Sequence, residues 1–167
     1  PFVLQVESAD GIAEHLASAV IDASGTWSQP NPLGGHGLPA VGEKENAARI
    51  RYGMPDILGA DRARYAGRNV LVVGAGHSAA GSLISLAQLA AEDRATRVVW
   101  AVRGNDLRRL FGGGANDGLP ERGALGRKLR DLISAGRLEV RHGFRIRRIE
   151  ESAKGLRVVP DDHTLPM

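Results

Sequence analysis

The fold is decided by residues 69–79, which read Asn-Val-Leu-Val-Val-Gly-Ala-Gly-His-Ser-Ala. Residues 70–73 are a continuous run of Val and Leu, as expected for a parallel strand that is covered on both faces. The run ends in a glycine-containing turn. A helix is expected from about residue 77 to about residue 92, because apolar residues recur there at helical spacing: Ala80, Leu83, Ile84, Ala87 and Ala91.

A second apolar run, Val-Val-Trp-Ala-Val, follows at residues 98–102 after a turn at residues 93–96. A strand, a helix and a strand in succession form a βαβ unit, and the crossover of such a unit is nearly always right-handed. The sequence therefore predicts an α/β fold, namely a Rossmann-like parallel sheet with flanking helices.

Segments on either side extend this pattern. A second amphipathic helix is expected between Pro120 and Gly136, because proline is typical of a helix start and glycine of a helix end. Residues 27–42 are rich in Pro and Gly, which predicts a linker or a domain crossing. Short strands are expected at residues 2–6, 138–140, 144–146 and 156–158.

The turn at residues 74–79 fits the pattern G-x-G-x-x-A, which is typical of a dinucleotide-binding turn when it joins a strand to a helix. Gly74 permits the tight turn, Gly76 lets a pyrophosphate approach the backbone, and Ala79 is small enough for the helix to pack on the strand. The free N–H groups at the start of the helix would face the phosphates. The expected cofactor-binding residues are Gly74, Ala75, Gly76, His77, Ser78 and Ala79.

Two of these residues have polar side chains with alternative roles. The Ser78 hydroxyl can donate to a phosphate oxygen, or it can bond to its own backbone as a first-turn residue. His77 is expected to contact ligand or solvent rather than to act as a catalytic base. No catalytic residue is predicted, because the sequence shows no catalytic constellation; Asn116 and Asp117, in a Gly-rich loop, are the one polar pair of interest.

The residue after the second strand predicts which dinucleotide binds. An NAD or FAD site has Asp or Glu there, to accept hydrogen bonds from the ribose 2′-hydroxyl. This chain has Arg103, which cannot accept a hydrogen bond but pairs well with a 2′-phosphate. Arg108 and Arg109 follow and can close on the same phosphate. The sequence therefore favours NADP(H), and the alternative is that these arginines are surface charges.

Two stretches together resemble a known group of flavoproteins. Residues 22–32, Asp-Ala-Ser-Gly-Thr-Trp-Ser-Gln-Pro-Asn-Pro, look like the hinge at which paired-domain flavoproteins cross from the FAD domain into the NADPH domain. Residues 69–79 look like the fingerprint of that NADPH domain. Residues 102–108 are similar to the segment after its second strand in thioredoxin-reductase-like proteins, where arginines hold the 2′-phosphate.

This resemblance implies a division of the chain. Residues 1–45 are expected to be the end of the FAD-domain strands and the hinge, and residues 46–167 the NADP(H)-binding domain. The resemblance also implies FAD in the complete protein, bound by an FAD domain of the same polypeptide, with NADPH delivering hydride to it. Because the chain starts at Pro1 without an initiator Met, we expect a segment of a longer two-domain flavoprotein that is inactive by itself.

Two departures narrow the resemblance. The chain has no cysteine, so the CxxC of thioredoxin reductases is absent and this segment cannot reduce disulfides. Residues 45–59 contain neither Phe nor His, so they lack the F-x-G-x-x-x-H linker motif of Baeyer–Villiger and flavin-containing monooxygenases. A monooxygenase-like or general FAD-dependent oxidoreductase remains.

Composition excludes other kinds of site. Without cysteine there are no disulfides, thiolate nucleophiles or sulfur-ligated metals, and no two of the five histidines stand at a metal-ligand spacing, so no metal is expected. No apolar run approaches the ~20 residues of a membrane span, and residues 1–5 are not expected to be a signal peptide, because no basic segment precedes an apolar stretch there. The sequence predicts a cytoplasmic protein without a membrane partner.

The net charge is +3, and the cluster Arg145, Arg147 and Arg148 is interpreted as the solvent side of a strand rather than a nucleic-acid surface.

A non-catalytic nucleotide-binding regulatory module is the alternative function. A methyltransferase that uses S-adenosylmethionine is disfavoured, because it requires an acidic residue where Arg103 stands.

Overall fold

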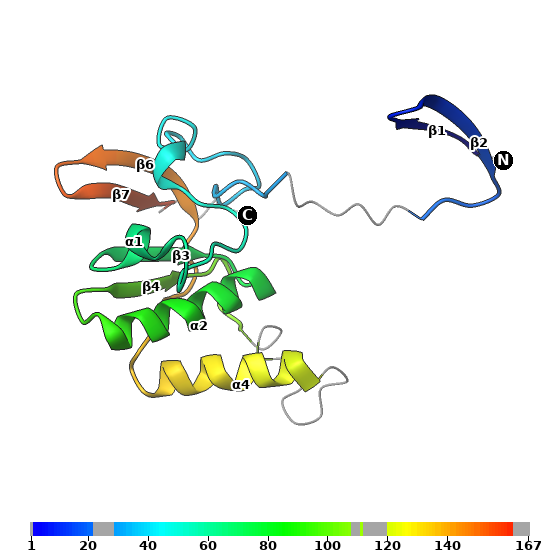
Figure 1. Cartoon of the computed structure of the whole chain (residues 1–167). Helices are drawn as coiled ribbons and strands as arrows, with labels where there is room; N and C mark the ends of the chain where they lie inside the picture. The colour runs from blue at the N-terminus through cyan, green and yellow to red at the C-terminus, as the bar shows by residue number, and fades with distance from the viewer. Residues whose placement is uncertain (1, 22–28, 108–110, 112–119, 162–167) are drawn as a thin grey trace. The chain divides into compact units, whose positions relative to one another are not determined.

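The computed structural model divides into two compact units, Pro1–Pro30 and Asn31–Met167. Figure 1 shows the elements of both. Among the described residues, no helix is long and apolar enough to cross a membrane. The structure describes residues 2–21, 29–107, 111 and 120–161.

The first unit is a β-hairpin. Strands β1 (Phe2–Ser8) and β2 (Gly11–Ala17) pair antiparallel, with Ser8 opposite Gly11 across a two-residue turn. The predicted strand at residues 2–6 is confirmed, whereas β2 was not expected from the sequence. Large apolar side chains are exposed on this hairpin, and a two-stranded ribbon by itself is marginally stable in water. Residues 22–28 of the expected hinge lie outside the described residues.

The second unit contains the predicted parallel sheet, with strand order β3-β4-β5. Strands β3 (Asn69–Val73) and β4 (Arg97–Ala101) pair in parallel with Val73 opposite Ala101, and β5 (Glu139–Arg141) pairs with β4 on its other side. The parallel sheet with flanking helices confirms the predicted α/β, Rossmann-like fold. β4 ends one residue earlier than expected, at Ala101.

Two helices provide the crossovers between these strands. Helix α2 (His77–Glu92) joins β3 to β4, and α4 (Pro120–Ser134) precedes β5. Right-handed crossovers in one direction place both helices on the same face of the sheet, as Figure 1 shows. Their apolar sides form the core, in which the most buried large side chains are Leu83, Leu86, Leu89, Trp100 and Leu129.

Helix α4 ends as its sequence predicts. Gly136 has a φ of 67°, its N–H donates to the Ile133 carbonyl, and the Arg137 N–H donates to the Leu132 carbonyl, each at 2.9 Å. This pair of hydrogen bonds is the Schellman motif, which needs a residue in the left-handed region. Glycine adopts that conformation without strain, so Gly136 fixes the point at which the chain turns into β5.

A second antiparallel hairpin packs against the sheet. Strands β6 (Ile146–Ser152) and β7 (Gly155–Pro160) replace the shorter strands expected there. Ile146 and Ile149 of β6 are buried beside Val73 of β3. The hairpin thereby covers the end of the strand that leads into the turn at residues 74–79.

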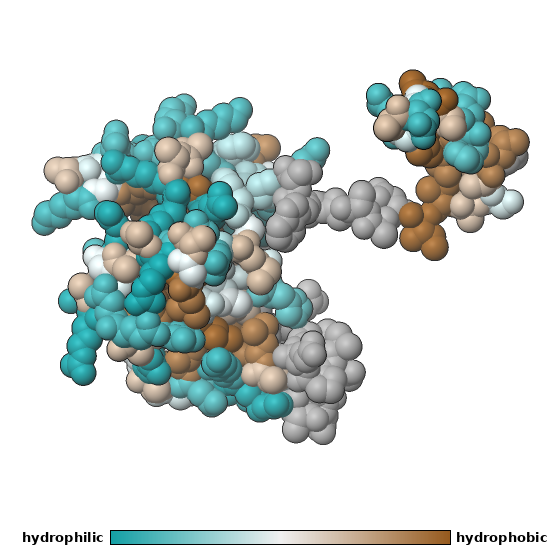
Figure 2. Space-filling model, viewed as in Figure 1, coloured by the Kyte–Doolittle hydropathy of each residue, from teal (hydrophilic) through white to brown (hydrophobic). Residues whose placement is uncertain are grey.

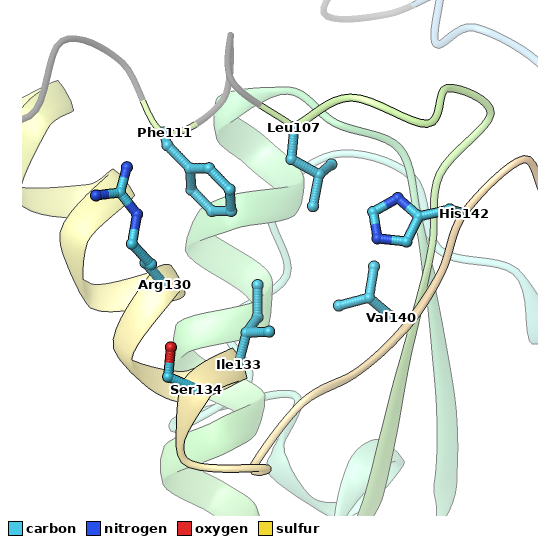
Figure 3. A pocket seen from close by; sticks show the side chains of 7 residues that line it. All are labelled: Leu107, Phe111, Arg130, Ile133, Ser134, Val140 and His142. Atoms are coloured by element: carbon cyan, nitrogen blue, oxygen red, sulfur yellow. The ribbon is translucent and has the colours of Figure 1, made fainter.

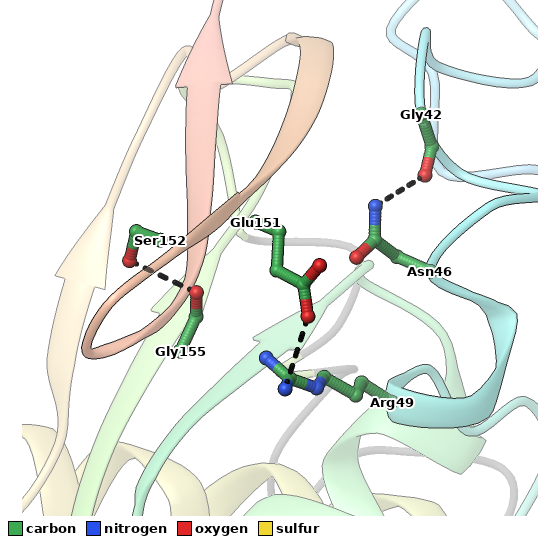
Figure 4. A network of polar contacts seen from close by, with 6 residues as sticks. All are labelled: Gly42, Asn46, Arg49, Glu151, Ser152 and Gly155. Carbon is green, nitrogen blue, oxygen red and sulfur yellow. Dashed lines mark hydrogen bonds and ion pairs between the residues drawn. The ribbon is translucent and has the colours of Figure 1, made fainter.

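The loop ahead of the sheet is fixed to β6. Gly34 and Val41 form parallel bridges with β6, and the Arg49 guanidinium lies 3.2 Å from the Glu151 carboxylate (Figure 4). Gly42 has a φ of 84°, and a Cβ there would collide with the Ile149 carbonyl oxygen. Two short helices follow, η1 (Ala47–Arg49) and α1 (Arg62–Tyr65).

Candidate dinucleotide-binding site

The turn between β3 and α2 is built on Gly74. Its φ of 120° lies in a region that residues with a side chain rarely adopt, so the turn requires glycine at this position. A Cβ placed on Gly74 would lie 4.0 Å from the Ala79 Cβ, which shows how closely the first turn of α2 approaches it. Ala79 therefore meets the need for a small residue that the sequence pattern indicated.

Gly76 has a different role in the same turn. It precedes α2 with a φ of −94° and a ψ of 175°, an extended conformation that any residue can adopt. A Cβ placed on Gly76 would meet no atom within 4 Å. The fold itself therefore does not require glycine here, and the open space beside its Cα is where a ligand can approach the backbone.

The start of α2 offers hydrogen-bond donors. The first N–H groups of a helix have no partner within the helix, and no side chain caps α2 at Gly76. Ala75, Gly76, His77 and Ser78 are all exposed. Unpaired donors, the positive end of the helix dipole and an open Gly76 together fit a pyrophosphate group.

Strand β4 fixes the turn from the core side. The Gly74 N–H donates to the Ala101 carbonyl at 3.0 Å, and the Gly74 carbonyl accepts from the Trp100 indole Nε1–H at 2.7 Å. Trp100 was not predicted as a site residue. The sequence feature that could have indicated a role for Trp100 is its place within a buried strand, because a buried indole N–H needs an acceptor.

Arg103 lies at the same edge of the sheet as the turn. Val73 and Ala101 are opposite each other where β3 and β4 end, so the chain after β4 leaves the sheet beside the chain after β3. Arg103 is exposed, and within the described part of the chain its guanidinium forms no ion pair. Arg103 follows two residues after the end of β4, and its contact with a 2′-phosphate stays a prediction. Arg108, Arg109, Asn116 and Asp117 lie outside the described residues.

The backbone on both sides of Arg103 is bonded to the last residue of β5 and to the chain that follows it. The Val102 N–H donates to the Arg141 carbonyl, and the Val102 carbonyl accepts from the Phe144 N–H, each at 2.9 Å. The Gly143 N–H donates to the Gly104 carbonyl at 3.4 Å. We call these three bonds the Arg103 clamp. Gly143 makes the clamp possible, because its φ of 64° belongs to the left-handed region.

An open pocket of about 400 Å³ lies between α4, β5 and the segment after β4. Figure 3 shows that the Phe111 ring and the Leu107 side chain lie on one side of it, with Val140 and His142 opposite. The Arg130 guanidinium lies over the Phe111 ring, 5.1 Å from its centroid. The lining is largely apolar, which suits the flat face of a ring system.

A second apolar surface lies where α2 and α4 meet, and Figure 2 shows apolar side chains gathered there. Gly81, Ile84 and Leu125 line a pocket of about 380 Å³ with Lys128 at its rim. No group of three or more His, Cys, Asp or Glu side chains that could hold a metal ion occurs among the described residues.

Comparison with known proteins gives distant structural neighbours. No protein-family model and no curated protein matches the chain. A thioredoxin reductase from Gloeobacter violaceus aligns with 71% of this chain and 29% of its own length, at 20% sequence identity and a TM-score of 0.43. An L-lysine 6-monooxygenase from Pseudomonas syringae aligns with 96% of this chain and 47% of its own length, at 16% identity and a TM-score of 0.37. The chain spans less than half of either protein, and at these TM-scores neither assigns it an activity.

Proposed function

We propose that this chain is the NADP(H)-binding domain of an FAD-dependent oxidoreductase. The observation that carries the proposal is the meeting of two features at one edge of the sheet. One is the open turn at Gly76, in front of the unpaired N–H groups of α2. The other is Arg103, an exposed residue two positions after the end of the neighbouring strand β4. The first suits a pyrophosphate, and the second suits a ribose 2′-phosphate.

The residues of this chain bind and orient the cofactor. Backbone N–H groups of residues 75–79 hold the pyrophosphate, with Ser78 and His77 at the first helical turn. Arg103, supported by Arg108, holds the 2′-phosphate. NADPH supplies a hydride when bound, and its acceptor is an FAD carried by another domain of the complete protein. The resemblance of residues 22–32 to an interdomain hinge supports this division.

Substitution of Gly76 by Ala tests whether nucleotide approaches this turn. The extended backbone of Gly76 accepts a Cβ that meets no atom within 4 Å. The free energy of unfolding of Gly76→Ala should therefore lie within about 1 kcal/mol of the wild-type value. The new methyl group occupies the space that the ligand needs, so affinity for both NADP⁺ and NAD⁺ should fall at least about tenfold. Calorimetric titration measures the affinities.

Gly74→Ala is the matched control for that variant. It adds the same methyl group to the same turn, but at a φ of 120°, so it should lower the free energy of unfolding by about 1–3 kcal/mol. A Gly76→Ala variant that binds both nucleotides as tightly as the wild type would place the ligand away from the turn and remove the basis of the proposal.

A further inference from the structure

The hydrogen bond between Trp100 and the turn links the core of the sheet to the proposed phosphate site. Trp100 lies in the middle of the β-sheet on β4 and is fully buried. Its indole Nε1–H donates to the Gly74 carbonyl oxygen at 2.7 Å, a short distance for an N–H donor. The ring therefore does more than fill the core, since its one polar atom ends on the first glycine of the turn.

This bond sets the direction of the next N–H group. The peptide bond between Gly74 and Ala75 is trans and planar, so the Gly74 carbonyl and the Ala75 N–H point in opposite directions. The carbonyl points inward at the indole. The Ala75 N–H consequently points outward, and among the described residues none accepts a hydrogen bond from it.

The other bond at Gly74 leaves this peptide plane free to rotate. The Gly74 N–H is held by the Ala101 carbonyl, but that N–H belongs to the preceding peptide plane. Glycine has no Cβ to restrict the rotation that would flip the carbonyl outward. Within the described chain, the Trp100 indole is the group that holds the Gly74–Ala75 peptide in one orientation.

We propose that Trp100 is a positioning residue for phosphate binding, which directs the Ala75 N–H at the pyrophosphate of the dinucleotide. The inference rests on the proposed function, because it assumes that a nucleotide lies at this turn. An inward-facing Ala75 N–H would leave the Gly74 carbonyl oxygen facing the phosphates, where two negative groups repel each other. The indole excludes that orientation before the ligand arrives.

Trp100→Phe tests the proposal, because it removes the donor and keeps an aromatic ring in the core. Affinity for NADP⁺ and for NAD⁺ should each fall about tenfold, and the ratio of the two affinities should stay as in the wild type. The pyrophosphate is common to both ligands, so the losses are equal. Arg103→Ala should give the opposite pattern, with a loss for NADP⁺ alone.

Two controls separate positioning from a general loss of packing. Leu129→Ala opens the same core at α4, away from the turn, and should lower stability without changing the affinity of the folded protein. Benzothienylalanine at position 100 replaces the indole N–H by sulfur at nearly the same volume, and should reproduce the effect of Trp100→Phe if that variant folds poorly. Inorganic pyrophosphate should shift the Ala75 amide resonance in the wild type and not in these donor-less variants.

The possible results distinguish the positioning role of Trp100 from the proposed function. Two results together support the positioning role. The donor-less variants lose affinity equally for both nucleotides, and pyrophosphate does not shift their Ala75 amide resonance. Unchanged affinity in the donor-less variants, or an equal loss in Leu129→Ala, overturns it and leaves the proposed function standing. A wild-type chain that binds neither nucleotide nor pyrophosphate overturns both.

Discussion

Glu43 shows how one buried carboxylate organises the loop ahead of the sheet. It is 5% exposed, and its oxygens accept hydrogen bonds from the Leu33 N–H at 3.0 Å, the Ala40 N–H at 2.7 Å and the Tyr52 hydroxyl. Burial raises the pKa of Glu43, but the hydrogen bonds to its charged form outweigh burial, and the net pKa is lowered. The Pro- and Gly-rich segment ahead of the sheet is therefore held in shape by charge as well as by glycine.

The sign of this shift gives a pH-dependent prediction for Glu43→Gln. A carboxyl group whose pKa is lower in the folded than in the unfolded protein stabilises the fold at pH values above the unfolded pKa. That stabilisation is lost as the pH falls through the pKa of the folded protein. At pH 7 the variant should be less stable by about 1–3 kcal/mol, because an amide cannot accept from all three donors. The difference should shrink as the pH falls below the ordinary glutamate value of 4.5.

Urea unfolding of both proteins at neutral and acidic pH measures this difference. A gap between wild type and Glu43→Gln that stays constant down to pH values well below 4.5 would mean that the charge of Glu43 contributes nothing. The same burial and the hydrogen bond to Glu43 raise the pKa of Tyr52, so Tyr52 remains a donor throughout this range.

Among the elements, the Arg103 clamp joins the end of β5 to the segment that carries Arg103. The clamp is therefore expected to influence the preference for NADP⁺ over NAD⁺. Gly143→Ala imposes strain at a φ of 64°, and its Cβ would lie 3.2 Å from the Asn105 side-chain oxygen, which must move by a few tenths of an ångström. We expect the strain to weaken the bond from the Gly143 N–H to the Gly104 carbonyl and so to loosen the segment around Arg103. The preference for NADP⁺ over NAD⁺ should fall severalfold, while affinity for NAD⁺ stays near the wild-type value, since the 2′-phosphate alone depends on Arg103.

Gly136→Ala is the matched control for Gly143→Ala. Gly136 has nearly the same φ, 67°, but its Cβ would meet nothing within 4 Å, and it lies at the end of α4. It should lose comparable stability and keep the nucleotide preference. If the two variants lose the preference equally, or neither does, the clamp has no part in specificity.

The elements show which features the sequence could predict. Local signals predicted the turn, α2 with its bounds and the end of α4 at Gly136, because each depends on residues close together in the chain. The Trp100–Gly74 bond and the clamp join residues 26 or more positions apart, so no local pattern reveals them. β2 was missed because its apolar residues are separated by Glu14 and His15.

At the scale of the whole molecule, the proposal predicts a chain that binds nucleotide and lacks flavin. Of the stretches that fit G-x-G-x-x-A, residues 74–79 are the one that follows an apolar strand and opens a helix, and an FAD site needs such a turn of its own. The purified chain should show no flavin absorbance band after gel filtration, and it should not oxidise NADPH with simple electron acceptors. Flavin that stays with the protein would contradict the division into domains. NADPH oxidation that Ser78→Ala abolishes would instead indicate a stand-alone dehydrogenase.

The role of Arg103 in NADP(H) binding is decided by a calorimetric titration of NADP⁺ and NAD⁺ into the wild type and Arg103→Ala. The ligands differ only in the 2′-phosphate, and a guanidinium–phosphate contact contributes about 1.5–3 kcal/mol, or roughly 10- to 100-fold in affinity. The wild type should prefer NADP⁺ by that factor, more strongly at low salt. Arg103→Ala should lose most of the preference and keep its affinity for NAD⁺. Equal affinities in the wild type, or a preference that survives in the variant, would make Arg103 a surface charge and contradict the assignment of NADP(H).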